Sequence, residues 1–248
     1  MEALGPAQLV FCVLAVTAAF AVRGTTGFGG NAIAVPLLTL LLPIQTVVAV
    51  MTVLTVLSSL GHWIKDWRRI AWREILRVAP FTLAGVLIGL HLFQTLDTRT
   101  LTRFFGAFVI LYAVFAMATS KRTVSPPPHW RWPLATALST LAGLVGTLFG
   151  GAAGPLYAIY LNALQLDKER FRVTITTILM VQALLRIGGY LTLGFYDQPT
   201  LIMLAAALPL VWIGARIGER VAMRIRQHTF NAVVGALLML SGALLLFK

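Results

Sequence analysis

Ten apolar segments, separated by short polar or glycine-rich stretches, dominate the pattern of the chain. Several have the roughly 17–25 residues that a membrane-spanning helix requires, and the shortest lie beside two glycine-rich stretches. We expect helices at about residues 7–22, 28–42, 46–64, 78–93, 104–119, 133–149, 152–164, 173–193, 200–215 and 230–247. The pattern therefore predicts an all-α protein that crosses a membrane several times.

The two glycine-rich stretches interrupt apolar sequence that would otherwise continue as helix. They are Gly24–Pro36 (GTTGFGGNAIAVP) and Gly146–Pro155 (GTLFGGAAGP). Non-helical backbone at membrane depth is tolerated only inside protein or beside a water-filled cavity. We therefore predict that each stretch is the tip of a helical hairpin that returns to the side from which it came. The alternative is that these glycines only permit tight packing between helices.

The second half of the chain resembles the first. After a shift of 129 residues, Pro80, Gly85, Ile88, Gly89, Thr100, Gly106 and Ala107 fall on Pro209, Gly214, Ile217, Gly218, Thr229, Gly235 and Ala236. The glycine-rich stretches align at a slightly different offset, with Pro36 on Pro155. We predict a first transmembrane repeat at residues 1–119, a cytoplasmic linker at 120–132 and a second transmembrane repeat at 133–248.

Basic residues indicate which loops face the cytoplasm, because loops on that side are enriched in Lys and Arg. The basic segments, predicted inside, are Lys65–Arg77, the linker, Lys168–Arg172 and Arg216–Arg226. The segments predicted outside are Gln94–Arg103, Gly194–Pro199 and the C-terminus. Equivalent loops of the two halves thus lie on opposite sides. This predicts two repeats of inverted topology, each with one broken-helix hairpin and three spanning helices.

Composition supports a membrane protein and excludes several other classes. Hydrophobic residues make up 58% of the chain and charged residues only 11%, whereas a soluble domain has roughly 25% charged residues. The net charge of +12 lies mainly in short segments between apolar runs, so we expect no binding of nucleic acid. A single cysteine, Cys12, excludes a disulfide framework. No basic residue precedes the first apolar run, so we expect it to belong to the mature protein.

The hairpin tips are the first candidate site. A helix that begins at such a tip presents free backbone N–H groups and partial positive charge, which favour an anion. Two inverted tips facing each other would surround one anion, and neighbouring hydroxyl and amide groups could donate further hydrogen bonds. The predicted substrate-binding residues are Arg23, Thr25, Thr26, Gly27, Gly29, Gly30, Asn31, Gly146, Thr147, Gly150, Gly151, Gly154 and Arg186.

Arg186 is the most unusual residue in that set. It lies thirteen residues into the apolar run 173–193, about 20 Å along a helix. None of the eight acidic residues lies in the centre of an apolar run, so Arg186 has no carboxylate partner there. An unpaired intramembrane cation is usually functional, and we infer that its partner is the substrate. The alternative is a structural role in capping hairpin carbonyls.

Other titratable residues leave choices open. Arg23 precedes the first tip and could face the anion or mark a helix end near the surface. His62 or His91 could shuttle protons, or each could be an interfacial residue. With no acid and no pair of histidines at ligand spacing in the spans, the sequence predicts neither an enzyme nor a metal site. We expect no cofactor.

The chain resembles the TauE/SafE family of bacterial membrane proteins, described as sulfite and organosulfonate exporters. The resemblance rests on Gly27–Val50, Gly143–Leu161, Asp167–Arg172 with the following helix, and Ala207–Val221. Ala34 stands where the family pattern usually has a second glycine before Val-Pro. The resemblance implies a transporter of small sulfur-containing anions built from two repeats. Its members are linked to sulfite, sulfoacetate, other sulfonates and small carboxylates.

We therefore predict a secondary transporter, and specifically an exporter, of a small anion such as sulfite, sulfoacetate or another organosulfonate. It would lie in the bacterial inner membrane, with the lipid bilayer and the anionic substrate as partners and protons as a candidate coupling ion. The alternatives are an anion channel that uses the same site and an importer of a small organic carboxylate.

Overall fold

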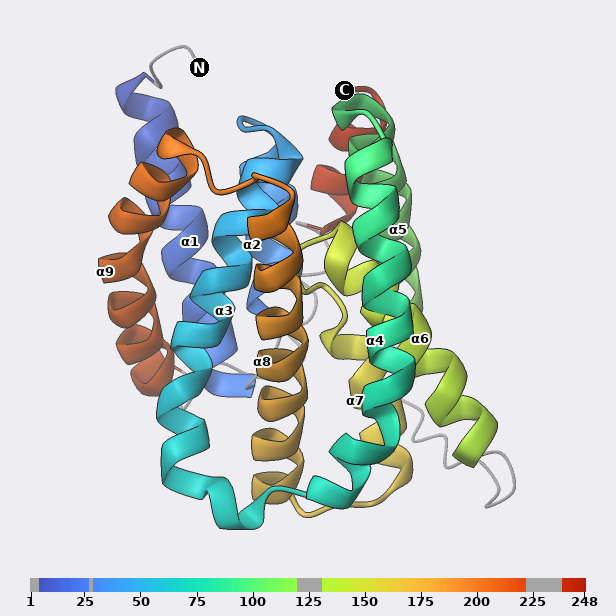
Figure 1. Ribbon diagram of the computed structural model, residues 1–248. Helices are drawn as coiled ribbons and strands as arrows, with labels where there is room; N and C mark the ends of the chain where they lie inside the picture. Colours follow the sequence, from blue (N-terminus) through green and yellow to red (C-terminus); the bar gives the residue numbers. More distant parts are fainter. Residues whose placement is uncertain (1–4, 27–28, 120–130, 222–237) are drawn as a thin grey trace.

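The computed structural model describes residues 5–26, 29–119, 131–221 and 238–248, and in these ranges it contains helices and no strands (Figure 1). The helices are α1 (Pro6–Thr26), α2 (Gly30–Thr39), α3 (Ile44–Asp66), the 3-10 helix η1 (Trp67–Arg69), α4 (Trp72–Thr95), α5 (Thr98–Thr119), α6 (Arg131–Leu148), α7 (Gly154–Ala163), α8 (Lys168–Thr192) and α9 (Gln198–Val221). Residues 238–246 are also helical. The predicted all-α fold is confirmed. The linker at 120–132 lies almost wholly outside the described residues.

Among the residues that the structure describes, four helices are long and apolar enough to cross a membrane: Pro6–Arg23 in α1, Trp72–Thr95 in α4, Glu169–Thr192 in α8 and Gln198–Ile217 in α9. Large apolar side chains also cover the outside of the bundle, among them Leu76, Leu111, Leu191 and Ile202, each more than 60% exposed. A soluble monomer rarely exposes apolar patches this extensive, whereas lipid is their natural solvent. The prediction of a polytopic membrane protein is confirmed.

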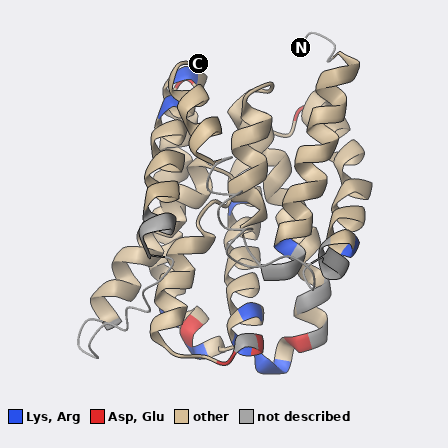
Figure 2. Cartoon of the chain, turned by 180° about the vertical axis from the view of Figure 1, so that it is seen from behind, with Lys and Arg blue, Asp and Glu red and all other residues tan. Residues whose placement is uncertain are grey.

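Charged residues concentrate near the two ends of the bundle, and those nearer its middle are basic (Figure 2). Three aspartates at these ends cap helices, because each carboxylate accepts a backbone N–H of the first turn. The pairs are Asp97 with Thr100 at 3.0 Å, Asp167 with Arg170 at 2.9 Å, and Asp197 with Thr200 at 3.0 Å. The helices α5, α8 and α9 therefore each begin directly after a capping aspartate at the end of the preceding loop.

Each outer pair of helices takes one member from each half of the chain. α1 packs mainly against α9, α4 packs mainly against α6, and α3 and α8 pack against each other between these pairs. Gly85 brings α4 close to the Thr140 carbonyl of α6, and Gly214 brings α9 close to the Thr17 carbonyl of α1. Gly85 and Gly214 are also aligned by the 129-residue shift, so two aligned glycines have equivalent packing, while the division into two repeats stays a prediction.

The helices that occupy equivalent positions in the two predicted repeats point in opposite directions along the bundle. In Figure 1, α3 runs downward and α8 upward, while α4 runs upward and α9 downward. The predicted cytoplasmic segments Lys65–Arg77 and Lys168–Arg172 meet at the lower end, where an ion pair joins Arg69 to Glu169. Gly194–Pro199, predicted outside, lies at the upper end. This grouping agrees with the sequence pattern, and the inverted topology itself stays a prediction.

The short helices α2 and α7 have ten residues each, or about 15 Å, half the thickness of a bilayer core. Each packs against the helix before it, α2 on α1 and α7 on α6. The alignment of Pro36 with Pro155 is wrong: Pro36 lies inside α2, whereas Pro155 lies in the first turn of α7. Pro155 suits that position, because the first turn of a helix does not need its N–H. The two tips are therefore built differently.

Candidate functional site

The tip between α6 and α7 turns on two glycines in the left-handed region. Gly150 has φ = 65° and Gly151 has φ = 88°, a conformation that glycine adopts without penalty. The Gly151 N–H donates to the Gly146 carbonyl at 2.8 Å, as in the Schellman motif that ends many helices. The glycines in this part of the predicted site are thus required by the turn itself.

One face of α8 is bonded to the end of α6. Gln182, Arg186 and Tyr190 follow one another at intervals of four residues and so share a face. Each side chain donates to a backbone carbonyl of α6. The acceptors are, in order, Ala142 at 2.6 Å, Gly146 and Thr147. Sequence reasoning found Arg186 but missed Gln182 and Tyr190, although their spacing from Arg186 was a usable signal.

Arg186 is completely buried, and only part of its guanidinium group is bonded. Its Nη1 donates to the Gly146 carbonyl, which is the capping role considered as an alternative. Its Nε and Nη2 have no hydrogen-bond partner within the part of the chain that the structure describes. Nη2 lies 3.3 Å from the position that a Cβ on Gly151 would occupy. Arg186 therefore both caps the tip and presents unused donors next to it.

Asn31 joins the two hairpins. It lies in the first turn of α2 and is 2% exposed. Its Nδ2 donates to the Thr55 hydroxyl at 2.7 Å and to the Gly150 carbonyl in the other tip. The same Nδ2 is 2.8 Å from the position of a Cβ on Gly151. The structure thus brings Asn31, the second tip and Arg186 together, although they are far apart in the sequence.

Arg23 is buried and is bonded to α3, so it does not mark a helix end at the surface. Its Nε donates to the Ser58 hydroxyl at 2.9 Å. Its Nη2 donates to the Ser59 hydroxyl at 2.8 Å and to the Thr55 carbonyl at 3.4 Å. Because Thr55 also accepts from Asn31, it connects Arg23 to the tips. These α3 residues were absent from the predicted set.

The remaining predicted residues have smaller roles in the geometry. The Thr147 hydroxyl is buried and donates to the Gly143 carbonyl at 2.8 Å, so its proton is used within α6. Gly29 has φ = 88° just before α2, and Gly30 lies close to the Ala19 carbonyl of α1. Gly154 begins α7. Gly27 and the side chains of Thr25 and Thr26 lie outside the described residues, as does the His62 side chain, and His91 is exposed on α4.

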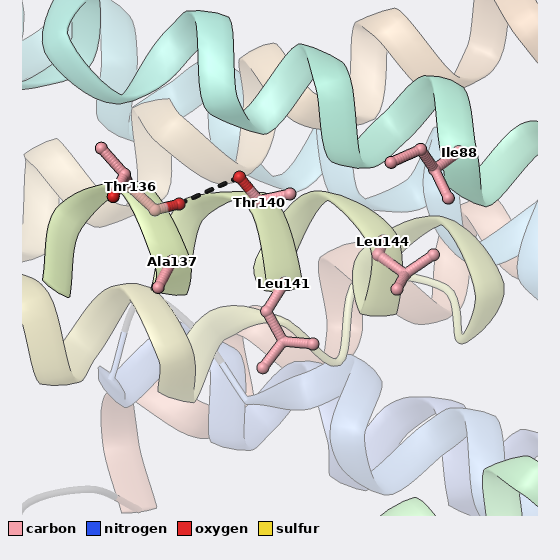
Figure 3. Close-up of a pocket in the computed structure, with 6 residues that line it drawn as sticks. All are labelled: Ile88, Thr136, Ala137, Thr140, Leu141 and Leu144. Carbon is pink, nitrogen blue, oxygen red and sulfur yellow. Dashed lines mark hydrogen bonds between the residues drawn. The ribbon is translucent and has the colours of Figure 1, made fainter. Parts of the chain in front are cut away.

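A hollow of about 430 Å³ between α4 and α6 lies apart from these residues (Figure 3). It is lined by Ile88, Thr136, Ala137, Thr140, Leu141 and Leu144. The Thr140 hydroxyl in this lining already donates to the Thr136 carbonyl at 2.9 Å. The lining offers no charge to an ion, and Arg186 is not part of it. This hollow is a feature of the apolar surface and not the candidate site.

Half-length helices that begin at glycine-rich breaks, as α2 and α7 do, are typical of secondary transporters. The comparisons with known proteins agree with that class. Residues 12–245 match the family described as Sulfite exporter TauE/SafE, and the chain belongs to this family. It is similar to the "Probable inner membrane transporter protein TsaS" of Comamonas testosteroni, with 26% identity over 190 residues, 76% of this chain and 78% of that protein. No solved structure matches the chain. The protein is thus a member of a family of membrane transporters.

Proposed function

We propose that the protein is a secondary transporter that exports a small anion, such as sulfite, sulfoacetate or another organosulfonate, across the bacterial inner membrane. The observation that carries the proposal is the partly bonded guanidinium group of Arg186 at the buried hairpin tip. Removing an arginine from water carries a penalty of several kcal/mol unless a counter-charge and hydrogen bonds compensate for it. A bound oxyanion would supply both to Nε and Nη2.

The distribution of acidic residues supports an anion as that counter-charge. Two ion pairs, Arg69–Glu169 and Arg77–Glu74, lie where helices begin at the lower end, and neither involves Arg186. Arg23 is a second buried cation, and hydroxyl and carbonyl oxygens surround it. An interior with two buried guanidinium groups favours negatively charged ligands over cations. The hydrogen bond from Asn31 to the Gly150 carbonyl connects the first hairpin to the second.

The pairing of helices supports alternating access. α1 with α9 and α4 with α6 form outer pairs that each combine the two predicted repeats. In inverted-repeat transporters, one part moves against the other around a site near the midplane. We place the predicted linker 120–132 in the cytoplasm and the C-terminus outside. Two arguments support export as the direction: the negative interior of the cell favours the exit of an anion, and the family is described as exporters.

The first test is binding by purified protein, measured as a thermal shift with sulfite, sulfoacetate, sulfate and acetate. Arg186→Met keeps an unbranched apolar stem and removes the charge. Arg73→Met makes the same change at an exposed position of α4 and is the matched control. We expect a sulfur oxyanion to stabilise the wild type and Arg73→Met, by about 2.7 kcal/mol at a ligand concentration of 100 Kd, and to leave Arg186→Met unchanged.

Efflux of the same anion from proteoliposomes tests transport itself. We expect efflux to increase when the membrane potential is negative on the side that contains the anion, and to be lost in Arg186→Met. If no anion stabilises the wild type, or if a cation does so better, the proposed anion site is wrong. An equal response of wild type and Arg186→Met would instead reduce Arg186 to a structural cap.

A further inference from the structure

Two buried amide oxygens at the candidate site have no hydrogen-bond partner. They are Asn31 Oδ1 and Gln182 Oε1, and no described residue donates to either. Both side chains are almost completely buried, at 2% and 0% exposure. An amide oxygen in such a place normally accepts a hydrogen bond from protein, water or ligand. The site therefore contains unused acceptors as well as the unused donors of Arg186.

The orientation of the Asn31 amide is fixed by its surroundings. Its Nδ2 faces the Gly150 carbonyl and the Thr55 hydroxyl. That hydroxyl donates its own proton to the Met51 carbonyl at 2.7 Å, so only its lone pairs are left for Asn31. Rotating the amide by 180° would place its oxygen against two acceptors. Oδ1 must therefore remain an acceptor that faces away from these bonds.

Gln182 is fixed in the same way. Its Nε2 donates to the Ala142 carbonyl at 2.6 Å, so a rotated amide would place Oε1 against that carbonyl oxygen. Gln182 lies one turn before Arg186 on the same face of α8. Its Oε1 is 3.0 Å from the position that a Cβ on Gly146 would occupy, and Arg186 bonds the carbonyl of that same residue. The acceptor on Gln182 therefore borders the same tip as the unused donors.

We propose that the transported anion also carries a hydrogen-bond donor, namely a hydroxyl, an amino group or an acid proton. This inference rests on the proposed function: Arg186 binds the anionic group, and Oδ1 of Asn31 and Oε1 of Gln182 accept from the donor. An anion without a donor would leave both amide oxygens unpaired next to its own negative charge. A site built to bond a substrate hydroxyl rejects analogues that lack it. The substrate class is thus narrowed to small anions such as hydroxylated or aminated sulfonates and protonated oxyanions.

The test compares 2-hydroxyethanesulfonate with ethanesulfonate, which share charge and sulfonate group and differ by one hydroxyl. Dissociation constants are measured with the purified full-length wild type and Gln182→Met. Gln8→Met makes the same change at an exposed position of α1 and is the control. We expect the wild type and the control to bind the hydroxylated ligand at least about tenfold more tightly. In Gln182→Met this ratio should shrink, mainly because the hydroxylated ligand binds more weakly.

The outcomes separate this inference from the proposed function. If the wild type binds both sulfonates equally and Arg186→Met binds neither, the donor requirement is wrong while the anion site stands. If neither ligand binds the wild type, the anion site falls as well, and the inference with it. If Gln182→Met weakens both ligands by the same factor, Gln182 only supports the fold and its oxygen has no role in selection.

Discussion

A single methyl group on Gly151 would test the geometry of the candidate site most directly. The φ of Gly151 is 88°, and an added Cβ would lie 2.8 Å from Asn31 Nδ2 and 3.3 Å from Arg186 Nη2. Gly151→Ala therefore introduces two separate effects. The backbone is strained because an L-residue disfavours the left-handed region. In addition, the Asn31 amide must move away from the Gly150 carbonyl that it bonds.

Two other glycines separate these effects. Gly194 has φ = 75° and open space around a Cβ, so Gly194→Ala has the strain alone, about 1–2 kcal/mol. Gly188 is helical with open space, so Gly188→Ala has neither effect and should stabilise the protein by about 0.5–1 kcal/mol. Gly151→Ala should add the loss of a hydrogen bond to the strain, for a total destabilisation of about 1.5–3.5 kcal/mol.

The assay is thermal unfolding of the three purified variants, with and without the anion that stabilises the wild type. We expect all three to fold, Gly151→Ala to have the lowest melting temperature, and the anion to stabilise Gly188→Ala and Gly194→Ala but not Gly151→Ala. If Gly151→Ala matched Gly194→Ala in both melting temperature and anion response, the tip would not be part of the binding site, and the reasoning above would be refuted.

Two further predictions concern the bundle around the site. Gly85→Ala would push a methyl group into the Thr140 carbonyl of α6, so it should lower the stability by about 1–3 kcal/mol in the same unfolding assay; a melting temperature equal to that of Gly188→Ala would contradict the α4–α6 packing. Hydrogen bonds from threonine hydroxyl and backbone groups lower the pKa of Asp97 and Asp197. Their stabilisation is therefore complete above the unfolded pKa of about 3.9 and is lost as the pH falls through the lower folded pKa. At pH values below about 4, the melting temperature of the wild type should decrease, and it should decrease less in a variant with both Asp97→Asn and Asp197→Asn. Identical pH profiles of the two proteins would contradict the capping role.

Much of the fold was predictable because a bilayer leaves an apolar segment few alternatives to a helix. The apolar run 152–164 corresponds to α7 (Gly154–Ala163), and the run 28–42 contains α2 (Gly30–Thr39). The predicted starts of helices whose first turn contains charged residues were less accurate. The run 173–193 underestimates α8, which begins at Lys168, because its polar first turn extends beyond the apolar stretch and is capped by Asp167.

The candidate site was predictable where the sequence departs from the pattern of an ordinary spanning helix. Glycine-rich breaks indicated the tips, and a lone cation in an apolar run indicated Arg186. The bonding partners on α3 and α8 were not predictable in the same way. Hydroxyl groups in helices often bond their own backbone, so Thr55 and Ser59 do not stand out. The contact between Asn31 and Gly150 depends on how the two hairpins pack, and no local pattern encodes that.

The pairing of α1 with α9 also affects how the protein can be made. α1 is synthesised and inserted well before α9, yet α9 is its main packing partner. In water, a helix whose apolar face stayed exposed until its partner had been synthesised would be prone to aggregate. In the bilayer, α1 is surrounded by lipid tails that are as apolar as leucine, so the exposure of its apolar face before α9 is inserted has little energetic cost. Insertion of the helices and their assembly are therefore separable steps, and the second tip can be closed only after α8, which carries Arg186, has been synthesised.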